Sequence, residues 1–128
     1  MGDVDEREAV LAANRAFYEA FERRDFDAMS DAWEHSDAVV CTHPGWRPLH
    51  GWAQVAGSWI ALLTNSQQLQ FIVTGEEVIC GADMAVVTCE ENLLDGAATG
   101  TVAAVNVFRR DEAGRWLLVS HHGGAVAG

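Results

Sequence analysis

The segment Thr101–His122 reads TVAAVNVFRRDEAGRWLLVSHH, and it decides the fold class of the chain. Two strand-like runs, 101–110 and 115–122, flank the turn-forming tetrapeptide at 111–114, a pattern typical of a β-hairpin. The two earlier runs of the same kind are Leu69–Cys80 and Met84–Leu94. Four consecutive strands joined by short turns predict an antiparallel meander.

The residues before the meander predict helices and one short strand. Apolar side chains recur every three or four residues from Val10 to Phe21, so we expect an amphipathic helix there. Asp25 can cap a second, short helix, and residues 37–42 follow as a short strand. No charged residue occurs from Gly51 to Gln68. A third helix in this stretch is predicted by the helical spacing of its apolar residues, which are Trp52, Val55, Trp59, Leu62 and Leu63. A helix without charge should be buried on more than one face.

Helices first and a meander last indicate an α+β domain in which the sheet curls around the helices. A chain of 128 residues is long enough to bury a core of its own. We therefore expect residues 1–128 to form a single domain.

Charge and composition exclude several classes of function. The formal net charge of −11 argues against a nucleic-acid or anionic-membrane partner, because phosphate binding needs clustered cations. The sequence has no lysine, which excludes Schiff-base chemistry and leaves His, Asp and Glu as general bases. The N-terminal residues are acidic and lack the pattern of a signal peptide, so we expect a cytoplasmic protein.

We expect neither a cofactor nor a metal. The three cysteines, which have no CxxC spacing, are Cys41, Cys80 and Cys89. His43 and His50 could approach His121 and His122 if the loop lies over the strand end. However, adjacent histidines on a strand point to opposite faces and rarely bind one ion together.

The loop 43–50, HPGWRPLH, is the best candidate for the mouth of a pocket. His43 and Arg47 each precede a proline, which biases them to extended conformations and predicts an ordered loop. An imidazole, the Trp46 indole and a guanidinium together are typical of a small-molecule site. The alternative is that Trp46 and Trp52 only close the core.

Strand parity predicts which polar groups face the interior. Because Arg109 should face solvent, Asn106 and Phe108 should point inward. On the last strand the same two-residue period puts His122 on the face that carries Trp116. Of the two neighbouring glutamates on the preceding strand, we favour Glu90 as the inward one, because the residues of its parity are polar.

Three motifs carry a family resemblance: His43-Pro-Gly-Trp46, Gly51-x-x-x-Val55-x-x-Ser58-Trp59, and Asn106-x-Phe108 leading into Trp116-x-x-x-x-His121-His122. With the order of elements, they resemble the SnoaL-like branch of the nuclear transport factor 2-like superfamily over essentially the whole chain. The resemblance implies a cone-shaped fold, in which three N-terminal helices pack in a curved antiparallel sheet around a deep pocket. Relatives include polyketide cyclases, isomerase-like and dehydratase-like enzymes, and many non-catalytic proteins.

An enzyme of this kind could use His43 or His122 as proton acceptor, with Glu90 orienting the imidazole or taking the proton itself. Asn106 and Trp46 would then donate hydrogen bonds to a carbonyl or enolate oxygen, which suits isomerisation, cyclisation or dehydration. The further residues that we expect to bind a small carbonyl or cyclic molecule are Tyr18, Phe21, Trp33, Trp59 and Phe108.

Two other classes of function compete with the enzyme. A binding module would keep the apolar pocket but need no titrating pair of residues. An assembly module would use the outer face of the sheet. The family resemblance also implies a homodimer that packs through this face. The apolar residues that parity assigns to this outer face are Ile72, Ala103, Val105, Val107 and Val119.

Overall fold

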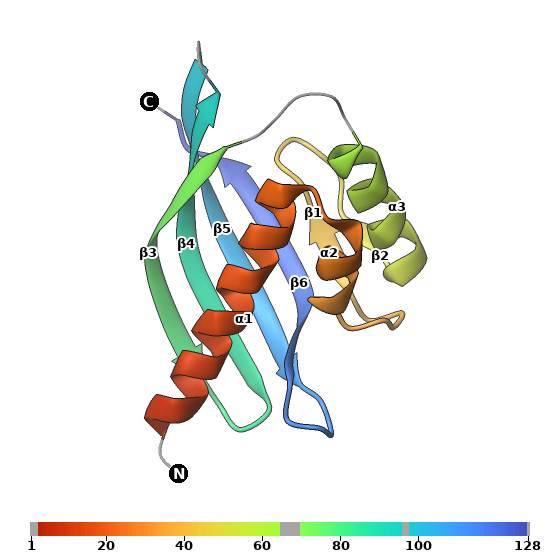
Figure 1. Ribbon diagram of the computed structural model, residues 1–128, viewed down its shortest axis with the longest axis vertical. Helices are drawn as coiled ribbons and strands as arrows, with labels where there is room; N and C mark the ends of the chain where they lie inside the picture. Colours follow the sequence, from red (N-terminus) through yellow and green to blue (C-terminus); the bar gives the residue numbers. More distant parts are fainter. Residues whose placement is uncertain (1–2, 65–69, 96–97, 128) are drawn as a thin grey trace.

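The computed structural model describes residues 3–64, 70–95 and 98–127. Its helices are α1 (Asp3–Arg23), α2 (Phe26–Asp31) and α3 (Trp52–Leu63). Its strands are β1 (Val40–Thr42), β2 (Leu49–His50), β3 (Phe71–Cys80), β4 (Met84–Asp95), β5 (Ala98–Arg110) and β6 (Trp116–Ala125). Figure 1 shows the long α1 lying across one face of a curved sheet, with α2 and α3 beside it.

The six strands form one sheet in the order β2-β1-β6-β5-β4-β3. All neighbouring pairs are antiparallel except β1 and β6, which run parallel. The predicted α+β class and the four-strand meander are therefore confirmed. The sequence did not predict β2, whose two residues pair with Val40 and Cys41 of β1. The prediction that a strand begins at Leu69 lies in part outside the described residues.

Asp25 caps α2 as predicted, because its side chain accepts a hydrogen bond from the Ala28 backbone N–H at 3.0 Å. The prediction for α3 is wrong in one respect. Its buried residues lie on a single face and are Val55, Ser58, Trp59 and Leu63. Ile60, on the other side, is 47% exposed. A helix without charge thus need not be buried all round, since single exposed apolar side chains are normal on protein surfaces.

Two β-bulges interrupt the sheet. On β6, Ser120 pairs with Val107 and Leu118 pairs with Phe108, so Val119 is an extra residue between the two pairs. On β3, the register shifts between Thr74 and Glu77, around Gly75 with its positive φ of 67°. A positive φ is inexpensive for glycine because it has no Cβ. Each bulge changes which face the following side chains occupy.

Aromatic side chains fill the space between the helices and the sheet. Phe17 of α1 is fully buried and makes edge contacts with Tyr18, Trp33 and Trp59, at centroid distances of 4.7, 6.4 and 5.6 Å. Phe21 continues this cluster with an edge contact to Trp59 at 4.9 Å. Edge-to-face pairs are a favourable arrangement of rings. The aromatic core therefore fixes α1 against both α3 and the sheet.

The two glycines near the end of β6 provide a test of this packing. A Cβ on Gly123 would lie 3.1 Å from Val102 Cγ1 and 3.3 Å from Pro44 Cγ, whereas a Cβ on Gly124 would meet nothing within 4 Å. We expect Gly123→Ala to lower the free energy of unfolding by about 1–2 kcal/mol, because the proline ring cannot rotate away. Gly124→Ala should leave it unchanged or slightly raised. Urea unfolding of both variants checks this, and equal effects would contradict it.

Candidate functional site

The bulge at Val119 decides which histidine of β6 enters the interior. His121 is 2% exposed, whereas His122 is exposed. The prediction that His122 faces inward is therefore wrong. Trp116 and Leu118 face inward, but the extra residue shifts the alternation by one, so His121 takes the inward position. Val119 itself is buried, which also corrects its assignment to the outer face.

On β4 the choice between the two glutamates is also reversed. Glu91 is 5% exposed and Glu90 lies on the exposed side. Alternate residues of a strand share a face, and Glu91 shares its face with the buried Val87 and Cys89. That apolar alternation was the signal in the sequence that could have identified Glu91.

A buried hydrogen-bond network surrounds Asn106, which faces inward as predicted and is fully buried. Its Oδ1 accepts a hydrogen bond from His121 Nδ1 at 2.5 Å. Its Nδ2 donates to Asn14 Oδ1 at 2.8 Å and to the Tyr18 hydroxyl at 3.1 Å. Sequence reasoning missed Asn14, although it lies one helical turn before Tyr18 on the inner face of α1.

The network ends in two carboxylates. The Tyr18 hydroxyl donates to Glu91 Oε2 at 2.7 Å, and Asn14 Nδ2 donates to Glu76 Oε2 at 2.9 Å. Burial raises the pKa of Glu91, although the hydrogen bond from Tyr18 opposes this. Burial, with Glu91 nearby, raises the pKa of Tyr18 far above its ordinary value. The phenol therefore stays protonated and acts as a hydrogen-bond donor.

His43 forms a second buried imidazole. Its Nε2 lies 2.9 Å from Ser58 Oγ, and Ser58 Oγ donates to the Val55 carbonyl at 2.7 Å. Because the single hydroxyl proton goes to that carbonyl, Nε2 must carry the imidazole proton. Burial lowers the pKa of His43 to about 4, so the ring is neutral at pH 7. The ring centroids of His43 and His121 are 6.4 Å apart.

Burial also lowers the pKa of His121, to about 3, and the neighbouring His43 and His122 lower it further. Both interior histidines are therefore neutral at physiological pH. Cys41 lies 3.6 Å from His43 Nε2, but burial raises the pKa of its thiol to about 12. A reactive thiolate is thus disfavoured at this cysteine.

The predicted aromatic residues divide between the interior and the surface. Trp33, Trp59 and Phe108 are buried, and Phe21 is partly buried. Trp46 is 45% exposed and covers His43 from outside at a centroid distance of 4.9 Å. The Nε1 atoms of Trp33 and Trp59 are buried, and neither has a hydrogen-bond partner among the described residues. An unpaired buried N–H is uncommon and calls for an acceptor.

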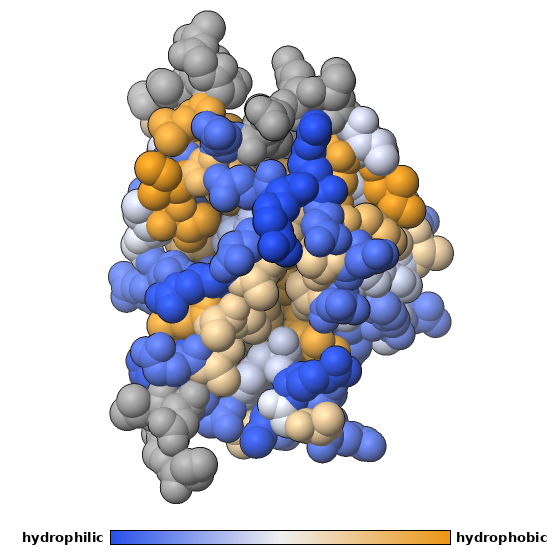
Figure 2. Space-filling view, in the orientation of Figure 1, coloured by the Kyte–Doolittle hydropathy of each residue, from blue (hydrophilic) through white to orange (hydrophobic). Residues whose placement is uncertain are grey.

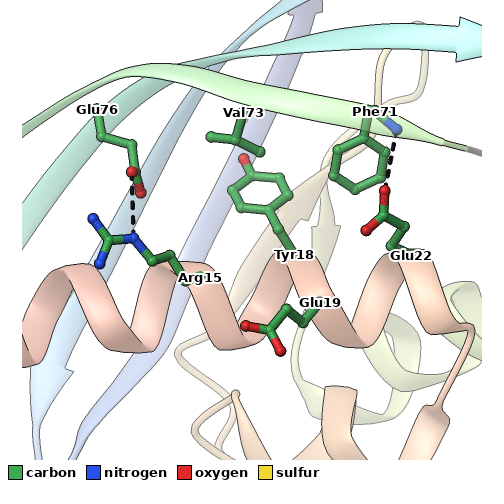
Figure 3. Close-up of a pocket in the computed structure, with 7 residues that line it drawn as sticks. All are labelled: Arg15, Tyr18, Glu19, Glu22, Phe71, Val73 and Glu76. Carbon is green, nitrogen blue, oxygen red and sulfur yellow. Dashed lines mark hydrogen bonds and ion pairs between the residues drawn. The ribbon is translucent and has the colours of Figure 1, made fainter.

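A cleft of about 250 Å³ opens between α1 and β3 (Figure 3). The residues that line it are Arg15, Tyr18, Glu19, Glu22, Phe71, Val73 and Glu76. Tyr18 points from α1 toward the sheet and is nearly buried, and its ring contacts that of Phe71 at 5.6 Å. One residue thus lines the cleft and also binds Asn106 in the interior. This gives the network a side that faces the surface.

Residues 3–64, 70–95 and 98–127 contain no group of three His, Cys, Asp or Glu side chains that could hold a metal ion. In the same ranges, no helix is both long and apolar enough to cross a membrane.

Comparison with known proteins identifies the family. A family model described as a SnoaL-like domain matches residues 10–127, and the chain belongs to this family. A candidate dehydratase of the NTF2-like family from Streptomyces avermitilis is 39% identical, with a TM-score of 0.90, over 99% of this chain and 100% of that one. No protein of curated function matches the sequence.

Two further solved structures share the fold. A candidate calcium/calmodulin-dependent protein kinase type II association domain from Thiobacillus denitrificans is 35% identical, with a TM-score of 0.83, over 91% of this chain and 94% of that one. A candidate ketosteroid isomerase from Shewanella frigidimarina is 14% identical, with a TM-score of 0.79, over 90% and 94%. At 14% identity the likeness concerns the fold alone. The relatives at 39% and 35% identity are thus named, one for a dehydratase and the other for an association domain.

The two neutral histidines predict an acid-sensitive fold. Their pKa values of about 4 and 3 lie below the unfolded value of 6.5, so the unfolded chain binds more protons between these limits. The contribution of each neutral imidazole to the free energy of unfolding is present above the unfolded pKa of 6.5. It is lost as the pH falls toward the folded pKa values of about 4 and 3. We expect each histidine to cost about 2 kcal/mol between pH 7 and 5.

Urea unfolding at several pH values checks this expectation. His121→Gln should flatten the pH dependence, whereas the matched change His122→Gln on the exposed neighbour should not. An unchanged slope in His121→Gln would show that His121 does not titrate as burial requires.

Proposed function

We propose that this protein is a cofactor-independent acid/base enzyme, an isomerase or a dehydratase, that acts on a small carbonyl or cyclic compound. His121 is the proton acceptor, in place of the exposed His122. The observation that carries the proposal is a buried neutral imidazole whose Nδ1 is engaged by Asn106 at 2.5 Å. Its Nε2 makes no hydrogen bond within the described residues.

The tautomer of His121 follows from its partner. Asn106 uses its NH₂ group for Asn14 and Tyr18, so only its carbonyl oxygen is left for His121. Nδ1 must therefore carry the proton, and Nε2 holds a lone pair. A general base needs such a lone pair in a neutral ring.

The unpaired indole N–H of Trp59 supports an oxygen-bearing ligand. Trp59 is fully buried, and its ring lies 4.8 Å from that of His43 and 6.2 Å from that of His121. A buried donor without an acceptor costs about 1–3 kcal/mol. An enolate oxygen of a bound substrate would supply the acceptor, and the donor would stabilise the charge that develops on it.

The chemistry balances without a cofactor. His121 Nε2 takes a proton from a carbon next to the carbonyl, and the negative charge moves to the carbonyl oxygen. In an isomerisation the same proton returns to another carbon. In a dehydration it leaves with the departing hydroxyl as water. The developing negative charge raises the pKa of His121 during the reaction, so a ring that is neutral in the free protein can accept a proton.

Access to this site involves the cleft between α1 and β3. Tyr18 and Phe71 line the cleft and contact each other, Phe71 also contacts Phe21, and Phe21 contacts Trp59 of the interior. A ligand that displaces these rings would reach the histidines from the side on which Tyr18 lies. Apolar contacts with the rings favour a flat, largely apolar molecule.

A thermal-shift screen with 2-naphthol, cyclic enones and β-hydroxy ketones tests the proposal, followed by turnover assays of any enone or hydroxy ketone that binds. We expect His121→Gln to lower turnover at least about 100-fold, the usual size of a general-base effect. His122→Gln should keep wild-type turnover, because its side chain lies on the other face of the sheet. Equal activity of His121→Gln and wild type would overturn the assignment of the base.

A second candidate function is assembly through the outer face of the sheet. Ile72 and Val105 on this face are 55% and 42% exposed. Figure 2 shows that the opposite side, which α1 covers, mixes hydrophilic side chains with apolar ones. The Thiobacillus relative is named as an association domain. Light scattering tests for the homodimer, and Val105→Glu should convert it to a monomer; a wild-type monomer would exclude it.

A further inference from the structure

We propose that Glu76, a residue outside the aromatic interior, is a positioning residue that fixes which ring nitrogen of His121 carries the proton. It acts through the two buried amides of Asn14 and Asn106. This inference rests on the proposed role of His121 as proton acceptor, and it adds a distant carboxylate to that site.

The β3 bulge brings Glu76 to α1. Gly75 adopts a positive φ of 67°, and the residue that follows turns its side chain toward the helix. Figure 3 shows the Glu76 carboxylate facing Arg15 across the cleft. The nearest approach is 3.6 Å, between Arg15 Nε and Glu76 Oε1. The second oxygen, Oε2, accepts the hydrogen bond from Asn14 Nδ2 at 2.9 Å.

The direction of each hydrogen bond then follows from the carboxylate. An ionised carboxylate can only accept, so Asn14 must turn its NH₂ group toward Glu76. Its carbonyl oxygen is left for Asn106, which must donate through Nδ2 at 2.8 Å. The carbonyl oxygen of Asn106 is left for His121, which must donate through Nδ1. One charge therefore sets the orientation of two amides and one imidazole.

Burial strengthens this relay. Asn14 and Asn106 are both fully buried, and their amide dipoles point the same way along the chain of hydrogen bonds. In such surroundings aligned hydrogen bonds polarise one another by roughly 10–30% per bond. Polarisation of the Nδ1–H group makes the opposite nitrogen, Nε2, a better proton acceptor. The relay thus favours the tautomer that catalysis needs.

A second branch of hydrogen bonds, from Asn106 through Tyr18 to Glu91, favours the same orientation of the Asn106 amide, but its terminal carboxylate is less reliably charged. Asn106 Nδ2 also donates to Tyr18, whose hydroxyl donates to Glu91. Burial raises the pKa of Glu91, so its negative charge is disfavoured. A protonated Glu91 could donate to Tyr18 and reverse this branch. Glu76 has an ion-pair partner in Arg15 and does not depend on that buried charge.

NMR of the protein labelled with ¹⁵N in its histidine rings tests the inference without any ligand. The His121 signals are identified from their absence in His121→Gln. In the wild type at pH 7 we expect a protonated Nδ1 and an unprotonated Nε2. Glu76→Leu should shift the Nδ1 signal and introduce the Nε2–H form. In Glu76→Leu combined with Tyr18→Phe, which removes the second branch, the Nε2–H form should become a major population.

Two matched variants complete the experiment. Glu76→Gln keeps the shape of the side chain but removes its charge and can turn an NH₂ group toward Asn14, so it should also introduce the Nε2–H form. Glu77→Leu changes the exposed neighbour and should have no effect on His121. Wild-type His121 shifts in Glu76→Leu, with or without Tyr18→Phe, would overturn the inference. An equal shift in Glu77→Leu would overturn it too. Neither result depends on turnover, so a failure here is distinct from a failure of His121 as the catalytic base.

Discussion

The carboxamide of Asn106 is the group on which the rest of the structure depends. It is fully buried on β5 and bonds to α1 through Asn14 and Tyr18 and to β6 through His121. A buried amide that loses its partners costs far more than an average hydrogen bond contributes, so each neighbour is held in place by the others. These hydrogen bonds therefore help the aromatic core to hold α1 against the sheet, and they also orient His121.

The β-bulges determine which side chains take part in this network. If β6 alternated regularly through Val119, with no bulge, His122 would face inward and His121 outward. Without the turn at Gly75, the Glu76 carboxylate would not reach Asn14. Bulges often lie beside functional sites, where they redirect single side chains. In this chain both bulges bring polar groups to one buried cluster.

The two bulges explain why some parts of the structure could be predicted from the sequence and others could not. Turn signals and periodicity predicted the helices and the meander, because each depends on local composition. The same reasoning placed Asn106 and Phe108 inward. It failed at His122, because a bulge leaves no local sign in the alternation of residues. It also failed at Glu90, because the buried residues of this strand, Val87 and Cys89, have the parity of Glu91. The role of Glu76 could not be predicted, because it depends on a hydrogen bond to Asn14, a residue 62 positions away in the sequence.

The site combines two features that the fold alone does not imply. Its histidines are neutral because burial disfavours their charged forms, and Nε2 of His121, the proton acceptor that we propose, holds a lone pair because Nδ1 donates to Asn106. Many proteins share a scaffold of this kind, and function depends on the residues within it.

The measurement that tests this account most directly is a neutron crystal structure of the free protein at pH 7, which locates deuterium atoms. The account predicts deuterium on Nδ1 of His121, none on Nε2, and both deuterium atoms of Asn106 Nδ2 directed at Asn14 and Tyr18. Deuterium on Nε2 of His121, alone or with Nδ1, would contradict it.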